Sequence, residues 1–269
     1  MPEAGRESKF RRFEALLSKY MRTRTKVLSA IAAALVCGVA VYTVFFRVTL
    51  RKAYGELPQA VIAHAAGAID GNRLTNSLEA LEHAIACGVR FIELDLRMTS
   101  DDTLVAVHDW GGFADMTGVP ATDSTPPSYA DFRNARILHR YTPLTYELID
   151  SVFAANPRLY LVTDKLTDVS AIDRFLPGLK PRMLVECFSA EQYRRCIESG
   201  IYMPLRSYNN LGCGGVNVVD GNGSRRMVYL RFLPTTFAVY RAGTTTRAGA
   251  DSVFAADRRV RFYYVDELE

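Results

Sequence analysis

The sequence predicts an α/β fold that follows a single transmembrane helix. Three observations support this prediction. Residues 27–46 form a run of 20 residues without a charge. From residue 58 onward, strand-like apolar segments alternate with helical segments, which is the pattern of a parallel sheet covered by helices. The composition is 49% hydrophobic and 23% charged over 269 residues, which is ordinary for a globular protein. One sizeable domain behind a membrane anchor is therefore expected.

The uncharged run Val27–Phe46 is long enough to cross a bilayer, since a helix of this length measures about 30 Å. Eight Lys and Arg residues precede it and three follow closely. This excess of positive charge predicts a cytoplasmic N-terminus and places the rest of the chain on the periplasmic or extracellular side. We expect a basic cytoplasmic tail at 1–26, a single-pass anchor at 27–46, a linker at 47–57 and the domain at 58–269.

A cleaved signal peptide is the competing interpretation of this run. The run is longer than the usual apolar part of a signal peptide, it begins after 26 residues, and it leads into Val-Phe-Phe-Arg without small residues for cleavage. A buried helix of a soluble protein would rarely be apolar on every face.

The positive charge of the chain is concentrated at its N-terminus. Residues 1–52 carry a net charge of +8 and the remainder carries −4, so a domain that binds nucleic acid is disfavoured.

The elements after residue 58 follow one another in a regular order. Helical periodicity predicts helices at Ser77–Cys87, Tyr146–Ala154, Val169–Phe175 and Ala190–Ser199. Strand-like composition marks Ala60–Ala63, Arg90–Leu96, Thr103–Val107, Leu159–Val162, Met183–Cys187, Val228–Leu233, Phe237–Tyr240 and Val260–Val265. The Gly- and Asn-rich segment Asn209–Arg226 predicts an irregular surface loop. About seven or eight strands indicate a (β/α)₈ barrel of the TIM type. An open doubly wound sheet is the alternative, but the sequence has no Gly-rich nucleotide-binding motif.

Titratable residues stand at the ends of four successive predicted strands. His64 ends the first, Glu93 and Asp95 lie in the second, and His108 ends the third. Asp164 and Lys165 end the fourth. Because the carboxyl ends of the strands form the active-site face of a parallel barrel, these side chains are expected around one opening.

Glu93 and Asp95 are two residues apart on a strand, so their side chains share a face. Neighbouring carboxylates repel, and a divalent cation such as Mg²⁺ or Ca²⁺ would neutralise them. The alternative is an ion pair with Arg90 or Arg97 at the surface.

Two histidines at one opening can serve as proton donor and proton acceptor, because their pKa lies near working pH. This chemistry suits His64 and His108. Lys165 suits a fixed positive charge beside a phosphate. The five cysteines have no Cys-x-x-Cys spacing, so a structural zinc site is disfavoured and any disulfide pairing stays open.

These segments resemble the glycerophosphodiester phosphodiesterase family. The resemblance rests on Ile62-Ala-His64, Asn76-Ser-Leu-Glu-Ala80, Phe91-Ile-Glu93-Leu-Asp95 and Thr99 through His108-Asp109. It continues more weakly through Leu161–Lys165 and Phe262–Leu268. It implies a (β/α)₈ phosphodiesterase with His64 and His108 as the acid/base pair, Glu93 and Asp95 as metal ligands, and Lys165 on the substrate phosphate.

The sequence departs from the family pattern at three places. The family's His-Arg-Gly is His64-Ala65-Ala66-Gly67, which lacks the phosphate-binding arginine, and the Glu of Glu-Asn-Thr is Thr75. The strand-four Glu-x-Lys is Thr163-Asp164-Lys165, and alternation assigns Asp164 to the opposite face from Thr163 and Lys165. Glu186, inside the apolar strand MLVECF, is the better third ligand, since a buried carboxylate is costly unless paired or bound to metal. Its alternative is a salt bridge.

The resemblance and the membrane anchor together predict a metal-dependent phosphodiesterase acting on glycerophosphodiesters or related lipid- or envelope-derived phosphodiesters. Two alternatives fit the same residues. One is an enzyme similar to phosphatidylinositol phospholipase C, which would work without a metal. The other is a membrane-tethered barrel that binds a phosphorylated ligand without cleaving it.

Overall fold

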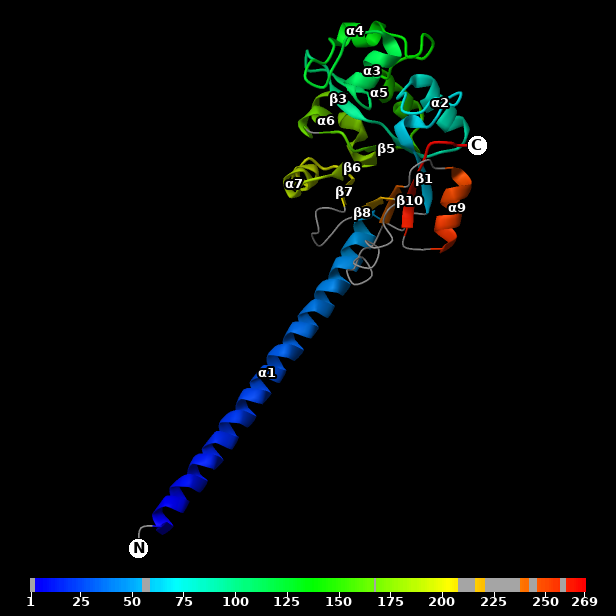
Figure 1. Cartoon of the computed structure of the whole chain (residues 1–269). Helices are drawn as coiled ribbons and strands as arrows, with labels where there is room; N and C mark the ends of the chain where they lie inside the picture. Colours follow the sequence, from blue (N-terminus) through cyan, green and yellow to red (C-terminus); the bar gives the residue numbers. More distant parts are fainter. Residues whose placement is uncertain are drawn as a thin grey trace. The chain divides into compact units, whose positions relative to one another are not determined.

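A computed structural model describes residues 3–54, 59–166, 168–207, 216–220, 238–241, 246–256 and 260–269. The chain forms two compact units, Met1–Ala53 and Tyr54–Glu269. The first is a helix and the second is a barrel (Figure 1).

Helix α1 (Glu3–Tyr54) continues through the predicted tail and anchor and into the predicted linker. Its stretch Leu16–Tyr42 covers 27 residues with a mean hydropathy of 1.8, and none of its most apolar window is buried within the protein. By length and composition this stretch could cross a membrane, and a signal sequence near an N-terminus has the same properties.

The barrel of the second unit confirms the predicted fold. Eight strands close on themselves, every neighbouring pair is parallel, and the first strand pairs with the last. In spatial order they are β1 (Ala60–Ala63), β10 (Val260–Val265), β9 (Ala238–Arg241), β8 (Val216–Asp220), β7 (Met203–Ser207), β6 (Met183–Cys187), β5 (Tyr160–Thr163) and β2 (Phe91–Glu93).

Helices lie outside the strands (Figure 1). Several begin where the sequence supplies a side-chain cap. The hydroxyls of Ser77, Thr145 and Ser189 accept hydrogen bonds from backbone N–H groups in the first turns of the helices that follow. The helices are α2 (Leu78–Ala86), α3 (Trp110–Thr117), α4 (Tyr129–Asn134), α5 (Tyr146–Ala155), α6 (Ser170–Phe175), α7 (Ala190–Glu198) and α9 (Arg247–Ala256), with 3₁₀ turns at His64–Ala66 and Pro177–Arg182.

One predicted barrel strand is not part of the barrel. The prediction Arg90–Leu96 divides into β2 and a separate strand β3 (Leu96–Met98). The predicted third strand is β4 (Leu104–Ala106), which pairs antiparallel with β3 as a two-stranded hairpin. This hairpin and the helices after it have a hydrophobic cluster of their own, formed by Val105, Val107, Trp110, Phe113, Phe132 and Ala135. We call this region, residues 96–135, the hairpin module.

A second difference concerns the Gly- and Asn-rich segment. The expected irregular loop Asn209–Arg226 contains barrel strand β8, because Val216–Asp220 supplies enough β-branched residues for a strand between β7 and β9. The remainder of that segment, and the predicted strand Val228–Leu233, lie outside the described residues.

The hydrophobic core of the barrel has two layers. The larger layer lies between strands and helices. The smaller contains buried residues of the strands alone and fills the interior: Ile62, Phe91, Val162, Leu184, Phe262 and Tyr264. This inner layer identifies which face of each strand points inward.

Candidate active site

A set of polar residues continues the inner face of the barrel beyond its hydrophobic layer. Each lies two residues after an inward apolar residue of its strand, and strand alternation therefore keeps it on the same face. All stand at or just after the carboxyl end of the strand, where barrel enzymes hold their active sites. They are His64, Glu93, Asp164, Glu186 and Asp266, which follow Ile62, Phe91, Val162, Leu184 and Tyr264.

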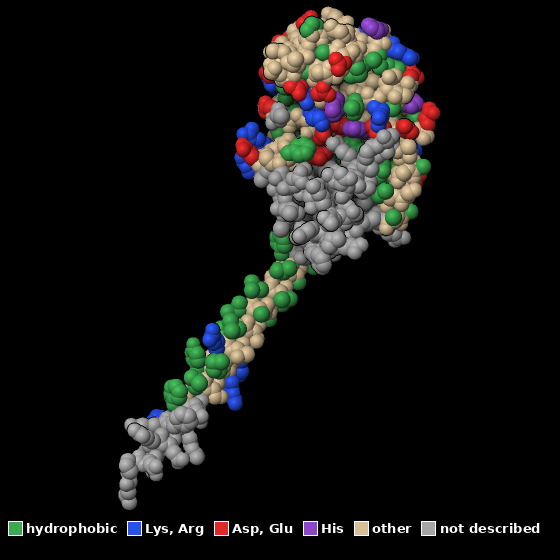
Figure 2. Space-filling view, viewed as in Figure 1, with side chains coloured by type: hydrophobic (Ala, Val, Ile, Leu, Met, Phe, Trp, Pro, Cys, Tyr) green, Lys and Arg blue, Asp and Glu red, His purple; other side chains and the backbone are tan. Residues whose placement is uncertain are grey.

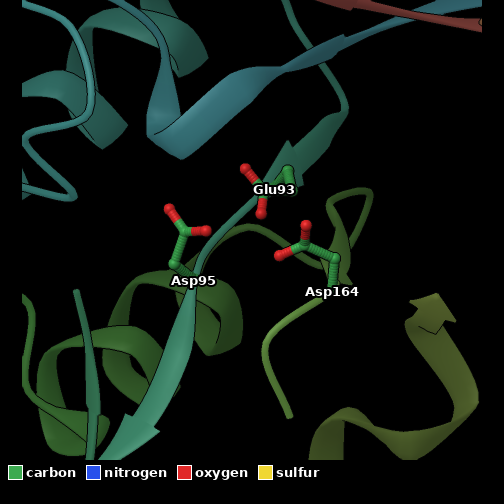
Figure 3. A group of neighbouring side chains, drawn as sticks. All are labelled: Glu93, Asp95 and Asp164. Carbon is green, nitrogen blue, oxygen red and sulfur yellow. The ribbon is translucent and has the colours of Figure 1, made fainter. Parts of the chain in front are cut away.

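Three carboxylates meet on this face. Glu93, at the end of β2, Asp95, two residues later, and Asp164, just after β5, each offer an oxygen that lies within 4.8 Å of the others. Figure 3 shows the three side chains turned toward one another. Their exposed fractions are 0%, 1% and 5%, so the group is buried. Buried carboxylates this close repel each other strongly, and hard divalent cations favour such oxygen ligands.

The position of Asp164 corrects the expectation from sequence. Alternation does separate Asp164 from Thr163, but the inward residue of β5 is Val162, so Asp164 faces the interior. Thr163 is buried on the other face, where its hydroxyl accepts from the backbone N–H of Leu96 at 3.5 Å. Glu186 is also buried at the end of β6, as expected, but it is not among the three carboxylates that meet.

Two segments of unusual backbone support the carboxylates. The Ala65 N–H donates to Glu93 Oε2 at 2.7 Å, and Asn76 exchanges two hydrogen bonds with Asp95, at 2.8 and 3.1 Å. Both Ala65 (φ 48°) and Asn76 (φ 45°) are in the left-handed region. Asparagine tolerates this region better than most residues, which explains its place at a buried turn. Sequence reasoning did not assign Asn76 to the site, although it belongs to the family motif.

Lys165 is the cation nearest to this group among the described contacts. Its Nζ lies 3.0 Å from Asp164 Oδ2 and 3.4 Å from Asp95 Oδ1. Burial alone would lower the pKa of the Lys165 ammonium, but the charges of Asp164 and Asp95 outweigh burial and raise its pKa. The lysine therefore stays protonated beside the carboxylates, as a fixed positive charge.

His64 is held by a residue from the far end of the chain. Its Nδ1 lies 2.8 Å from Oδ1 of Asp266, which directly follows β10, and its ring packs edge-on against Tyr264 with the centroids 5.8 Å apart. An ionised Asp266 fixes the proton on Nδ1 and leaves Nε2 for other chemistry. The Arg73 guanidinium approaches the second Asp266 oxygen at 3.9 Å. Neither Asp266 nor Arg73 was predicted, because contacts across the closing edge of a barrel leave no local sequence signal.

His108 belongs to the hairpin module and has an aspartate of its own. Its Nδ1 lies 2.7 Å from Asp109 Oδ2, while Asp109 Oδ1 accepts from the Gly112 N–H and caps α3. These contacts lower the pKa of the Asp109 carboxyl. The Val107 N–H donates to the Asp95 carbonyl oxygen at 2.7 Å. This backbone hydrogen bond joins the segment just before His108 to Asp95, one of the three carboxylate residues.

The barrel face thus combines the His64–Asp266 pair, three buried carboxylates and one protonated lysine, and the hairpin module carries the His108–Asp109 pair. Figure 2 shows histidine, acidic and basic side chains gathered in one part of the barrel unit. Such a set can move protons at two points and stabilise negative charge on a substrate, which suits transfer or hydrolysis of a phosphoryl ester.

Comparison with known proteins agrees with this chemistry. Residues 68–156 match the model of the glycerophosphoryl diester phosphodiesterase family, a stretch that includes Glu93, Asp95 and His108. A search of curated protein sequences finds no match.

Solved structures share the barrel. A glycerophosphodiester phosphodiesterase from Agrobacterium tumefaciens str. C58 is 14% identical with a TM-score of 0.58, over 78% of this chain and 96% of that one. One from Parabacteroides distasonis ATCC 8503 is 17% identical with a TM-score of 0.57, over 77% and 92%. A phosphodiesterase from Oleispira antarctica, in complex with the product sn-glycerol-3-phosphate, is 17% identical with a TM-score of 0.52, over 80% and 95%. Residues 68–156 are thus similar in sequence to the glycerophosphoryl diester phosphodiesterase family, and the closed parallel barrel is the fold that these solved structures share.

Proposed function

We propose that the barrel hydrolyses glycerophosphodiesters or related lipid- or envelope-derived phosphodiesters to an alcohol and a phosphate monoester. The observation that carries the proposal is the inner face at the carboxyl ends of the strands. There, His64 and the three carboxylates extend one hydrophobic layer, and the Lys165 ammonium contacts two of the carboxylates. The sn-glycerol-3-phosphate held by the Oleispira phosphodiesterase is a monoester of the expected kind.

The carboxylates fit a divalent cation, Mg²⁺ or Ca²⁺. Glu93, Asp95 and Asp164 would hold it, since their oxygens meet in a buried place, and a divalent cation would add positive charge to that of the Lys165 ammonium. A bound cation would neutralise negative charge on the phosphoryl oxygens of the substrate. Glu186, on the same inner face, remains a candidate for a fourth ligand or an outer contact.

His64 and His108 would carry out the two proton transfers. One Nε2 accepts a proton from the attacking water as its oxygen bonds to phosphorus. The other histidine donates a proton to the alcohol oxygen as the phosphorus–oxygen bond breaks. Asp266 and Asp109 support this role by holding Nδ1 of the two rings, at 2.8 and 2.7 Å. Both aspartates are positioning residues.

Two cations would bind the substrate phosphate. Lys165, fixed between Asp95 and Asp164, supports binding of the phosphoryl oxygens. Arg73 stands on the loop between β1 and α2, half-exposed beside Asp266, and would provide the positive charge that the replacement of the family arginine by alanine has removed. A hydrogen bond and an ion pair hold this loop. Asp70 accepts from the Tyr141 hydroxyl at 2.7 Å and forms an ion pair with Arg140 at 2.8 Å.

We also propose that α1 anchors the enzyme, with its N-terminus in the cytoplasm and the barrel on the other side. The basic flanks and the apolar stretch Leu16–Tyr42 support this orientation. Lipid-derived substrates would then be available at the membrane that anchors the enzyme. A protease that cannot cross the membrane should digest the barrel from outside in intact spheroplasts; digestion only after lysis would contradict the orientation.

The decisive experiment measures hydrolysis by the full chain in detergent, with glycerophosphocholine, glycerophosphoethanolamine and bis(p-nitrophenyl) phosphate as substrates. EDTA should abolish turnover, and Mg²⁺, Ca²⁺ or Mn²⁺ should restore it. Glu93→Gln should prevent restoration, whereas Glu79→Gln, which removes charge from a carboxylate that accepts hydrogen bonds from Thr142 and is not among the three meeting carboxylates, should not. Absence of turnover by a folded wild-type protein on every substrate would contradict the proposal and favour a barrel that only binds its ligand.

A metal-independent reaction similar to that of phosphatidylinositol phospholipase C is the second candidate. The observation that favours it is Lys165, whose ammonium already lies between Asp95 and Asp164, where it can offset carboxylate charge without a metal. Cleavage of phosphatidylinositol vesicles that persists in EDTA would select this candidate.

A further inference from the structure

Two buried cysteines lie in contact on the outer side of the barrel wall. Cys187 ends β6 and Cys196 lies in α7, and their sulfur atoms are 3.7 Å apart. Their exposed fractions are 1% and 0%. Cys187 is one residue beyond the inward Glu186, so alternation directs it away from the site and toward the helix. The sequence alone does not determine which cysteines pair. In the fold, Cys187 and Cys196 are neighbours.

The surroundings favour a bond between the two sulfurs over a metal or a catalytic role. The only group of His, Cys, Asp or Glu residues with metal-type spacing among the described residues is the carboxylate trio, which includes neither cysteine. The hydrogen bond with Cys187 lowers the pKa of the Cys196 thiol against the opposing effect of burial. A lower pKa favours the thiolate, which is the form that attacks a disulfide.

We propose that Cys187 and Cys196 are joined by a disulfide in the membrane-anchored protein. The sulfurs need to approach from 3.7 Å to about 2.05 Å. The oxidant is a protein or small-molecule disulfide on the non-cytoplasmic side, where such bonds persist. Cys196 attacks one sulfur of the oxidant and releases a thiol. Cys187 then displaces the second thiol, so the pair loses two protons and two electrons while the oxidant's bond becomes two thiols.

The bond would tie α7 to the strand that carries Glu186. It closes a short loop, 188–195, between a barrel strand and the helix that covers it. Neither sulfur belongs to the proposed catalytic machinery, so the inference depends on the orientation of the anchor and not on the phosphodiesterase activity.

The test uses the full chain in isolated membranes of the cells that make it. Membranes are denatured in iodoacetamide without reductant, digested, and analysed by mass spectrometry. We expect a linked peptide containing Cys187 and Cys196, while Cys87, which contacts His83, is alkylated and serves as the internal control. Alkylation of both Cys187 and Cys196, or a link from either to another cysteine, would overturn the proposal.

A second measurement separates the bond from simple packing of two thiols. Thermal unfolding of the full chain in detergent is followed with and without a reductant. Reduction should lower the Tm of the wild type by about 5 °C or more, and should leave Cys187→Ala/Cys196→Ala unchanged. Cys87→Ala should respond as the wild type does. An equal Tm of the wild type with and without reductant would contradict the disulfide.

Discussion

The barrel wall and the hairpin module contribute to the site in different ways. In the wall, His64, Glu93 and Asp164 follow inward apolar residues of strands that are joined in one closed sheet. In the hairpin module, His108 follows a short antiparallel strand outside that sheet, and a separate hydrophobic cluster around Trp110 supports it. One histidine is therefore positioned by the barrel and the other by an insertion between β2 and β5.

One sequence pattern can therefore arise from two architectures. An apolar run followed by a histidine looks the same at Ala60–His64 and at Thr103–His108. Backbone hydrogen bonds help to join the regions, since the Val107 N–H donates to the Asp95 carbonyl and the Ala106 N–H to that of Leu144. The position of His108 thus rests on the module's own cluster and on the hairpin residues Leu96, Leu104 and Ala106, which pack in the main core.

The strongest test of the comparison removes each histidine in turn. If both regions serve one reaction, His64→Ala and His108→Ala should each reduce kcat by about 10²- to 10⁴-fold, the usual contribution of a proton-transfer group. Unfolding curves should stay close to that of the wild type. His139→Asn is the matched control, since His139 is exposed and has a positive φ that asparagine accepts. A small reduction of kcat for His108→Ala alone would show that the hairpin module takes no part in catalysis.

The second test disrupts the core of the hairpin module. Trp110 is 2% exposed and packs edge-on against Phe113 and Phe132. Trp110→Ala should destabilise the module by about 3–5 kcal/mol, since a large cavity replaces the ring. Hydrogen exchange should then show faster exchange in 104–134 than in the barrel strands. Equal acceleration in both regions would mean that they unfold as one unit.

A third test sharpens the account of the barrel wall by comparing two inward carboxylates. Asp164→Asn should weaken activation by Mg²⁺ or Mn²⁺ at least about tenfold, because it removes one of three meeting carboxylates. Glu186→Gln should change the activation constant by much less. The measurement is the metal concentration at half-maximal activity, and the reverse order would restore Glu186 as the third ligand.

The smallest expected effect concerns the cap of α3. Asp109→Ala should cost about 1 kcal/mol of stability, since the Gly112 N–H loses its acceptor. The lowered pKa of Asp109 sets the sign of the pH dependence. The ionised carboxylate stabilises the fold above its ordinary pKa of 3.8, and this contribution is lost as pH falls through the lowered value. Denaturant midpoints of wild type and variant should therefore converge below about pH 4; a constant difference would show that charge has no part in the cap.

Much of the fold could be predicted from the sequence, because alternating strand and helix patterns are local. The helix beginning after Ser77, for example, follows from its cap and its period. The place of β4 could not be predicted, since three apolar residues do not reveal which strand they pair with. At the site, Glu93 and Asp95 follow from spacing, whereas Asp164 required knowledge of which β5 residue points inward, and that depends on the packed interior.

The pairing of β1 with β10 has a consequence for how the protein is made. His64 and Asp266 are separated by 202 positions, so ribosomes working at about 5–20 residues per second need roughly 10–40 s to supply the partner of that histidine. During this interval the apolar helix has already emerged and can reach a membrane, while the sheet still has an open edge. If α1 is the anchor proposed above, the nascent chain would reach the membrane before β10 closes the barrel, and His64 would gain its Asp266 partner only after that closure.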